Sequence, residues 1–99
     1  MTKTLYAEFT VKEGSETRVA EMMATLTEHV RNEPGNVMFL PYTRETNPRE
    51  YFVFEVYRDE QAFQEHIGAD YGREFNAELA DHIEGDGSAL TWLNPLIQP

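Results

Sequence analysis

The sequence contains no cysteine, which excludes disulfide bonds, thiolate catalysis and cysteine-bound metals. It is also poor in basic residues, with 8 Lys and Arg against 18 Asp and Glu and a formal net charge of −10 at pH 7. This charge keeps the surface soluble and repels polyanions, so we expect neither nucleic acid nor an anionic membrane as a partner. No segment approaches the roughly 20 apolar residues that a membrane-spanning helix needs. Together with the lack of cysteine, this favours a soluble, cytoplasmic protein.

The sequence also lacks the short motifs of several common enzyme classes. It has no Walker loop, no dinucleotide-binding glycine pattern, no H-E-x-x-H motif and no nucleophile elbow. The histidines at positions 29, 66 and 82 are too widely spaced to suggest a metal site. Glu78 and His82 are one helical turn apart, but a solvated surface pair is the simplest interpretation of that spacing. We therefore expect neither a metal nor a bound cofactor.

What is present is a globular composition, 40% hydrophobic and 12% aromatic, and its 99 residues predict one domain spanning residues 1–99. Residues 4–11 alternate apolar and polar side chains, as a half-buried strand does. An apolar stripe with helical spacing follows Ser15, a residue type that often caps helices. The stripe consists of Val19, Met22, Met23, Leu26 and Val30.

Turn signals divide the middle of the chain. Pro34-Gly35 ends the first helix, and residues 37–44 predict a second strand. Because proline cannot donate a backbone hydrogen bond, Pro41 places that strand at a sheet edge or at a bulge. Residues 45–49, which include an Asn-Pro pair, predict a hairpin loop. Residues 51–58 are apolar on both faces, as a strand covered on both sides would be.

Two short helical segments and a last strand complete the pattern. Asp59 is expected to cap the first segment, and Gly68 separates it from a second segment that Asp70 is expected to cap. Gly85-Asp-Gly87 ends the second segment, and residues 89–93 alternate as a strand does. The apolar positions of the two segments are Ala62, Phe63 and Ile67, and then Phe75, Leu79 and Ile83.

The resulting order, β-α-β-β-α-β, predicts an α+β protein with the ferredoxin-like fold, a four-stranded antiparallel sheet with its helices on one face. In this fold the first and third strands are central and the other two are edges. The opposite face of the sheet would expose Tyr6, parts of residues 38–42 and one apolar row of residues 51–58. Because an exposed apolar patch usually has a partner, we expect a homodimer that packs sheet to sheet.

Residues spread over positions 5–93 resemble the antibiotic biosynthesis monooxygenase family. The matching residues are Glu33-Pro-Gly-Asn36, Phe39, Tyr51-Phe-Val-Phe-Glu-Val-Tyr57, Asp59, Ala62-Phe63, His66, Phe75 and Leu79. The resemblance implies a dimeric α/β barrel with a pocket between the sheet and the helices of each subunit. Members include cofactor-free oxygenases of aromatic polyketides and quinols, a sugar-phosphate-type isomerase and heme-degrading enzymes, so fold alone does not select the reaction.

The sequence departs from two branches of this family. Heme-degrading members have an Asn on the first strand and a Trp near the second helical segment. Here the first strand has no Asn and the single Trp is Trp92, on the last strand, which disfavours heme. Many relatives carry a second histidine shortly after the position of His66, where Tyr71 is the nearest counterpart here. One acid–base group in place of two argues against a two-base isomerase.

His66 and Tyr71 are candidates for catalysis. His66 shares a helical face with Ala62 and Phe63, so it is expected to point toward the sheet, where an imidazole can abstract a proton near neutral pH. Alternatively, its hydrogen bonds only stabilise the junction between helix and sheet. Tyr71, between the two helical segments, is expected to donate a hydrogen bond to a developing phenolate oxygen, or else is a packing aromatic.

Glu55 is the third catalytic candidate. A carboxylate in an otherwise apolar central strand is costly unless it is paired or hydrogen-bonded. It is expected to orient His66 as part of a base–orienter pair. The alternative is a structural ion pair with Arg44, Arg58 or Arg73.

The remaining candidates are expected to line an apolar cleft for the substrate. Turn geometry alone explains an asparagine after Pro-Gly, and aromatic strand residues are often only packing, so each also has a structural interpretation. The expected substrate-binding residues are Asn36, Phe39, Phe54 or Val53, Tyr57, Phe63, Phe75 and Trp92.

Together, the residues and the resemblance favour a cofactor-independent monooxygenase that acts on a quinol, an anthrone or a similar polyketide-like aromatic, with dioxygen as second substrate. His66 would remove a phenolic or benzylic proton, and the electron-rich substrate would itself reduce dioxygen. One alternative is an isomerase or other proton-transfer enzyme that uses His66 and Glu55. The other is a non-catalytic dimeric domain that binds a small ligand.

Overall fold

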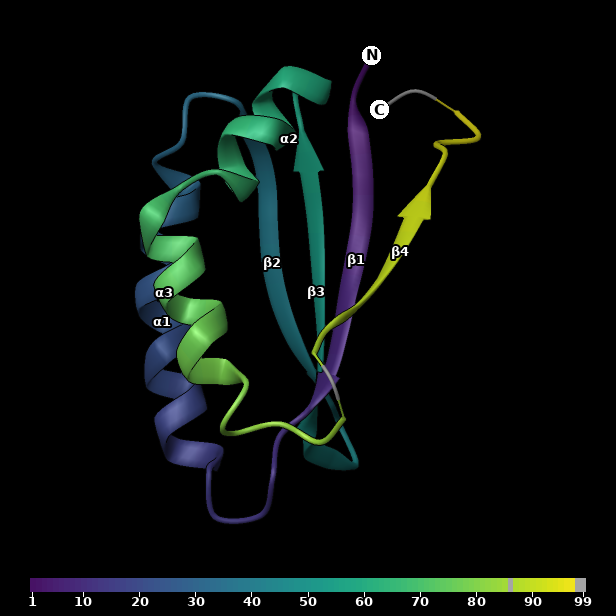
Figure 1. Cartoon of the computed structure of the whole chain (residues 1–99). Helices are drawn as coiled ribbons and strands as arrows, with labels where there is room; N and C mark the ends of the chain where they lie inside the picture. The colour runs from purple at the N-terminus through teal and green to yellow at the C-terminus, as the bar shows by residue number, and fades with distance from the viewer. Residues whose placement is uncertain (86, 98–99) are drawn as a thin grey trace.

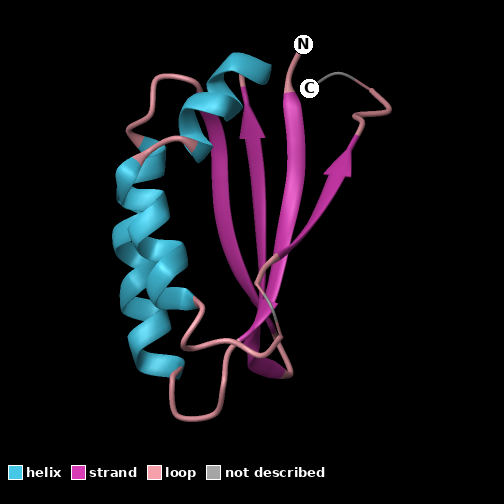
Figure 2. Cartoon of the chain, in the orientation of Figure 1, coloured by secondary structure: helices cyan, strands magenta, loops and turns pink. Residues whose placement is uncertain are grey.

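A four-stranded antiparallel sheet carries three helices on one of its faces in the computed structural model, which describes residues 1–85 and 87–97 (Figures 1 and 2). The elements are β1 (Lys3–Thr10), α1 (Glu16–Arg31), β2 (Asn36–Arg44), β3 (Asn47–Tyr57), α2 (Glu60–Ile67), α3 (Asp70–Leu79) and β4 (Ala89–Leu93). Asp86, within the predicted Gly85-Asp-Gly87 break, lies outside the described residues. No helix in the described ranges is long and apolar enough to cross a membrane.

The strand order confirms the ferredoxin-like fold. The sheet runs β2-β3-β1-β4, so β1 and β3 are central and β2 and β4 are the edges. The two central strands, β1 and β3, pair with each other in antiparallel orientation, from Lys3 opposite Tyr57 to Thr10 opposite Glu50. Pro41 lies on β2, an edge strand that has a neighbouring strand on one side only. A residue without a backbone N–H is tolerated in such a strand.

Period-two alternation gives the sheet two different faces. Leu5, Ala7 and Phe9 of β1 are buried on the face that carries the helices, and Val53 of β3 is buried beside them. The stripe predicted on α1 packs onto this face, with Val19 and Val30 fully buried. Each large apolar side chain buried here contributes roughly 1.5–3 kcal/mol relative to exposure. This core fixes the face from which the functional side chains project.

Three local predictions were wrong. The hairpin after β2 has only two turn residues, since Arg44 already pairs with Asn47 and β3 begins there. The Asn-Pro pair lies within β3 because the Asn47 side chain accepts from the Arg49 N–H and holds the strand entry. Asp70 is the first residue of α3, and Ala69, which has no side-chain oxygen, occupies the cap position.

The predicted cap of α2 is confirmed. The Asp59 carboxylate accepts a hydrogen bond from the Ala62 N–H at 2.8 Å.

Ile83 was also placed in the wrong element. Its spacing from Leu79 suggested another turn of helix, but α3 ends at Leu79. Ile83 instead forms an isolated β-bridge with Val11 and is buried beside it. A backbone hydrogen bond of 2.9 Å from the Glu84 N–H to Thr10 closes the same junction. Four-residue spacing alone therefore did not distinguish a helix from a buried bridge.

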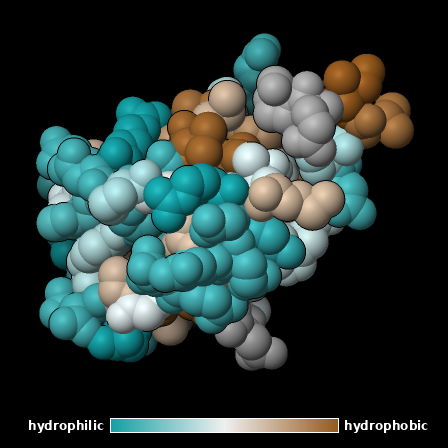
Figure 3. Space-filling view, turned by 90° about the horizontal axis from the view of Figure 1, so that it is seen from above, coloured by the Kyte–Doolittle hydropathy of each residue, from teal (hydrophilic) through white to brown (hydrophobic). Residues whose placement is uncertain are grey.

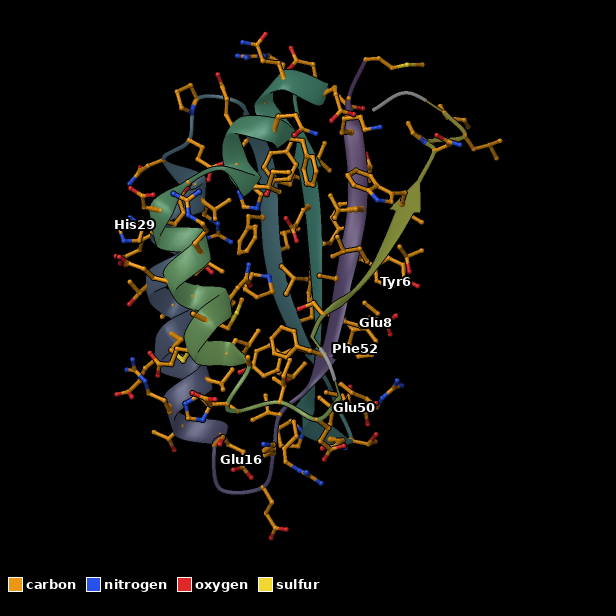
Figure 4. All side chains as sticks on the ribbon, viewed as in Figure 1. Tyr6, Glu8, Glu16, His29, Glu50 and Phe52 are labelled. Carbon is orange, nitrogen blue, oxygen red and sulfur yellow. The ribbon has the colours of Figure 1, made fainter. Side chains whose placement is uncertain are left out.

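The face of the sheet without helices is largely apolar. Figure 4 shows Tyr6, Glu8 and Phe52 on this side. One row across the sheet runs from Leu40 through Phe54 to Tyr6. Seen from the end that carries the chain termini, the helix side is mostly hydrophilic, and hydrophobic surface gathers where the C-terminal tail lies (Figure 3).

Candidate active site

A cavity of about 390 Å³ lies between the sheet and the helices. This volume is within the range of small-molecule sites. Most of its lining is apolar and comes from the buried face of the sheet and from the helices, including Leu5, Phe9, Phe39, Val53, Phe63 and Phe75. The charged or polar side chains that line it are Glu55, His66, Asn76 and Ser88. The cavity therefore offers an acid–base group in mainly apolar surroundings.

His66 lies between two carboxylates. Its Nδ1 is 3.0 Å and 3.2 Å from the two carboxylate oxygens of Glu33, and its Nε2 is 3.7 Å from Oε1 of Glu55. The side chains of all three are largely buried, with exposed fractions of 16%, 17% and 8% for His66, Glu33 and Glu55. A histidine in this position can act as an acid–base group toward a molecule in the cavity.

Glu55 projects from β3 into the cavity. Burial raises the pKa of this carboxyl, while a hydrogen bond from Tyr57 and the nearby His66 oppose the rise. The Tyr57 hydroxyl donates to Oε1 at 2.7 Å. The pKa of Tyr57 is itself raised, by burial and by the carboxylate, so the phenol remains a donor.

The predicted arginine alternatives for Glu55 do not occur. Arg44 pairs with Glu50 at 3.0 Å, Arg58 pairs with Asp59 at 3.4 Å, and Arg73 pairs with Asp70. All three arginines are on the surface, where an ion pair costs little desolvation. The partners of Glu55 are therefore Tyr57 and His66, which matches the expectation that Glu55 contacts the candidate base.

Sequence reasoning missed Glu33 as a functional residue. It lies in the turn after α1, where its N–H donates to Val30 and its carbonyl accepts from Asn36. Gly35 lets this turn approach α2 closely, because a Cβ built there would be 2.3 Å from the Cβ of Ala62. Glu33 was part of the family pattern, and that was the available signal; its contact with His66 depends on how the turn packs on α2.

Tyr71 contacts Glu33 and lies outside the cavity. Its hydroxyl donates to Oε2 of Glu33, and its ring stacks on His29 at a centroid distance of 4.7 Å. It lines a separate groove between α1 and α3. Tyr71 was expected to hydrogen-bond a substrate oxygen. In the structure its hydroxyl hydrogen is instead donated to Glu33, and its side chain does not line the cavity.

The predicted substrate-binding residues fall into two groups. Phe39, Phe63 and Phe75 line the cavity. Phe54 does not, because it pairs with Tyr6 on the opposite face of the sheet, whereas its neighbour Val53 lines the cavity.

Three other expected contacts lie beside the cavity rather than in it. Asn36 donates to the Met38 carbonyl at 3.0 Å, which satisfies the backbone at the irregular start of β2. The Tyr57 ring packs on Phe63 and its hydroxyl is used by Glu55, as described above. Trp92, 46% exposed, packs edge-on against Phe63 at 4.8 Å. Tyr57 and Trp92 therefore support residues of the lining, whereas Asn36 stabilises the start of β2.

His82 and Glu78 have partners that do not line the cavity. His82 Nδ1 is 2.9 Å from the Ser15 hydroxyl, and its Nε2 is 3.5 Å from Glu78, as expected for a surface pair. Arg18 also holds Glu78 through two hydrogen bonds of 2.5 and 2.7 Å. Within residues 1–85 and 87–97, no three His, Asp or Glu side chains are grouped as a metal site would require.

The raised pKa of Glu55 predicts a pH-dependent effect of Glu55→Gln on stability. Burial places the pKa of the folded state above the ordinary 4.5, so ionising this carboxyl costs the folded protein more than the unfolded chain. The cost is absent at acid pH and grows as pH rises through the folded-state pKa. Glu55→Gln can still accept a hydrogen bond from Tyr57 but cannot ionise. The unfolding free energy of this variant relative to wild type should therefore be higher at about pH 8 than at about pH 4, by on the order of 1 kcal/mol.

Urea unfolding of wild type and variant at both pH values measures this difference. Glu50→Gln is the matched control, since Glu50 lies on the same strand and its pKa is lowered by the hydrogen bond from Arg44. The Glu50→Gln variant should become less stable relative to wild type as pH rises. An equal effect of Glu55→Gln at both pH values would contradict the burial argument.

Comparison with known families identifies the family of this chain. The profile of the antibiotic biosynthesis monooxygenase family matches residues 3–78. The chain belongs to this family. No curated protein matched the chain in a separate comparison. The family profile extends from β1 through most of α3 and includes Glu33, Glu55, His66 and Tyr71.

Several solved structures superpose on nearly the whole chain. Rv0793 from Mycobacterium tuberculosis is similar at 21% identity and a TM-score of 0.90, over 99% of this chain and 98% of that one. A structure named antibiotic biosynthesis monooxygenase is similar at 16% identity and a TM-score of 0.90, over 98% and 100%. PA3566 from Pseudomonas aeruginosa is similar at 18% identity and a TM-score of 0.88, over 97% and 95%. At these identities, the likeness shows the fold.

Proposed function

We propose that this protein is a cofactor-independent monooxygenase of an uncharged, electron-rich aromatic such as a quinol or an anthrone. The observation that carries the proposal is the placement of His66, between Glu33 and Glu55, in the wall of an apolar cavity. Such a site can remove a proton from a hydrophobic substrate and keep the resulting anion away from bulk water. Membership of the antibiotic biosynthesis monooxygenase family supports the same class of reaction.

The reaction follows for an anthrone-like CH₂ group. The C–H proton passes to His66, and the two electrons of the C–H bond remain on the substrate as a carbanion delocalised onto oxygen. The carbanion reduces dioxygen stepwise, a C–O bond forms, and the peroxide takes the proton back from His66. Loss of water from this hydroperoxide leaves a ketone, so one oxygen atom enters the product and the other leaves as water. The protein contributes positioning, desolvation and charge stabilisation.

The lining favours a substrate without negative charge. None of the described residues that line the cavity is Lys or Arg, and the acid–base end already carries a carboxylate. A substrate carboxylate or phosphate would enter this cavity without a counter-ion, which is costly in apolar surroundings. A neutral aromatic with an acidic hydrogen avoids that cost. This argues against a phosphorylated substrate for the proton-transfer alternative.

Oxygen uptake measured with a panel of quinols and anthrones tests the proposal. Uptake above the rate of autoxidation in buffer, with one atom of ¹⁸O from ¹⁸O₂ in the product, is the expected result. Exchange of the substrate proton with D₂O without oxygen uptake would instead support an isomerase or other proton-transfer enzyme. Tight binding with neither reaction would support a ligand-binding domain. Either of these outcomes would contradict the monooxygenase.

We further propose that a second copy of the chain covers the apolar outer face of the sheet. Phe54 and Leu40 lie next to each other on this face, and Tyr42 there is 57% exposed. A face of this kind suits a self-complementary interface better than water. Sedimentation should give twice the 11.5 kDa of one chain, and Leu40→Glu should shift it toward the monomer. A monomeric wild-type protein would contradict this proposal.

A further inference from the structure

The two ring nitrogens of His66 face different surroundings. Nδ1 is within hydrogen-bond distance of both oxygens of the Glu33 carboxylate. Nε2 has no hydrogen-bond partner in the described part of the chain, and the carboxylate of Glu55, which also lines the cavity, lies 3.7 Å away. The position of the proton in the neutral ring therefore determines the role of Nε2. If the proton is on Nδ1, Nε2 can act as a base toward a molecule in the cavity; if it is on Nε2, that nitrogen is a hydrogen-bond donor.

The Glu33 carboxylate is held in place from two other elements. The Tyr71 hydroxyl of α3 donates to its Oε2, and α2 presents His66 to the same group. Burial and the hydrogen bond to Glu33 raise the pKa of Tyr71, so its phenol stays protonated and remains a donor. The Tyr71 ring is fixed in turn by stacking on His29, with an interplanar angle of 19°. Glu33 thus has little freedom to turn away from the histidine.

From this arrangement we infer that Glu33 and Tyr71 are positioning residues that keep the proton of neutral His66 on Nδ1 and direct the Nε2 lone pair into the cavity. A carboxylate only accepts hydrogen bonds, so the nitrogen that faces Glu33 must be the donor. The other groups facing the ring are Glu55 and Tyr57 of β3, and the Tyr57 hydroxyl is already donated to Glu55. A histidine free in water prefers its proton on Nε2, so the site reverses the ordinary preference.

The catalytic consequence rests on the proposed function, but the tautomer itself is a property of the resting protein. Long-range ¹H–¹⁵N correlation spectra of protein labelled at histidine nitrogen, recorded without any ligand, report which nitrogen is protonated. The His66 signals are assigned by their loss in His66→Gln. Wild type should show a protonated Nδ1 and a bare Nε2. Glu33→Leu should lower the Nδ1–H to Nε2–H ratio about tenfold, as expected from the loss of the charge-assisted hydrogen bond to Nδ1. Tyr71→Phe leaves the Glu33 carboxylate in place but frees it to turn, so it should lower the ratio by a smaller factor.

Controls separate positioning from loss of fold. Tyr71→Phe removes only the hydroxyl and keeps the stacked ring, and Tyr42→Phe is the matched change at an exposed tyrosine outside the cluster, which should leave the ratio unchanged. A wild-type His66 protonated on Nε2 would overturn the inference. So would an unchanged ratio in Glu33→Leu with a folded circular dichroism spectrum.

Kinetics distinguish this inference from the function itself. With an oxidised substrate in hand, Tyr71→Phe should lower kcat with KM unchanged, because Tyr71 does not line the cavity. A raised KM with unchanged kcat would make Tyr71 a substrate contact and overturn its positioning role. If no substrate is oxidised but the tautomer is as described, the proposed function fails and the inference about Glu33 and Tyr71 stands.

Discussion

His66→Ala is expected to lower the rate of substrate-dependent oxygen uptake roughly 10²- to 10⁴-fold, the usual contribution of a general base. The reason is geometric, because His66 is the titratable nitrogen base that the cavity lining contains in the described residues. Glu55 cannot replace it easily, since the Tyr57 hydroxyl occupies one of its oxygens and it is held on a rigid central strand. The measurement is kcat/KM for uptake, corrected for autoxidation.

Two controls make this result specific. His82→Ala removes a histidine that contacts Ser15 and Glu78 away from the cavity, and it should leave the rate unchanged. Added imidazole should restore part of the activity of His66→Ala, because the deletion leaves space for a small base beside Glu33 and Glu55. Wild-type turnover in His66→Ala would remove His66 from the mechanism.

Gly35→Ala is expected to destabilise the fold by about 1–3 kcal/mol and to lower activity as well. The added methyl group would lie 2.3 Å from the Cβ of Ala62 and 3.3 Å from its Cα, and neither atom belongs to a flexible side chain. The turn must therefore move away from α2. Because Glu33 lies in this turn and His66 lies on α2, the movement also lengthens the 3.0 Å contact between them.

A double-mutant cycle tests this explanation. Ala62→Gly removes the opposing methyl group at a cost of about 1 kcal/mol for glycine in a helix. In Gly35→Ala/Ala62→Gly the loss should be smaller than the sum of the two single losses. For stability, Gly72→Ala is the matched control, because a Cβ there meets only the His66 carbonyl oxygen, at 3.9 Å, and the helical position favours alanine. Additive losses in the cycle would rule out the close approach as the cause.

Local pattern predicted much of the fold. Alternation predicted β1 and β4 to within a residue at each end, and Pro41 correctly indicated an edge strand because a missing N–H is tolerated there. The errors arose where one local signal has two structural meanings. An Asn-Pro pair is common in turns, yet here it begins β3, and Ile83 has helical spacing from Leu79 yet forms a bridge with Val11.

The candidate site was predicted only in part. Helical spacing and the composition of the third strand indicated that His66 and Glu55 would meet, and their side chains are 3.7 Å apart. Strand parity contradicts the prediction of Phe54 as a cavity residue, since a strand cannot place adjacent residues 54 and 55 on the same face. Tyr71 could not be assigned, because the direction of a hydroxyl on a helix depends on which neighbour accepts from it.

The sequence by itself determined the order of the elements, the buried face of each one and the lack of any thiol chemistry, because these follow from residue type and short-range period. Only the tertiary structure decided that Glu33 meets His66 and that Tyr71 holds Glu33. These contacts join Glu33 to residues that lie 33 and 38 positions later in the sequence. They depend on a turn approaching a helix through the missing side chain of one glycine, and no local pattern encodes that approach.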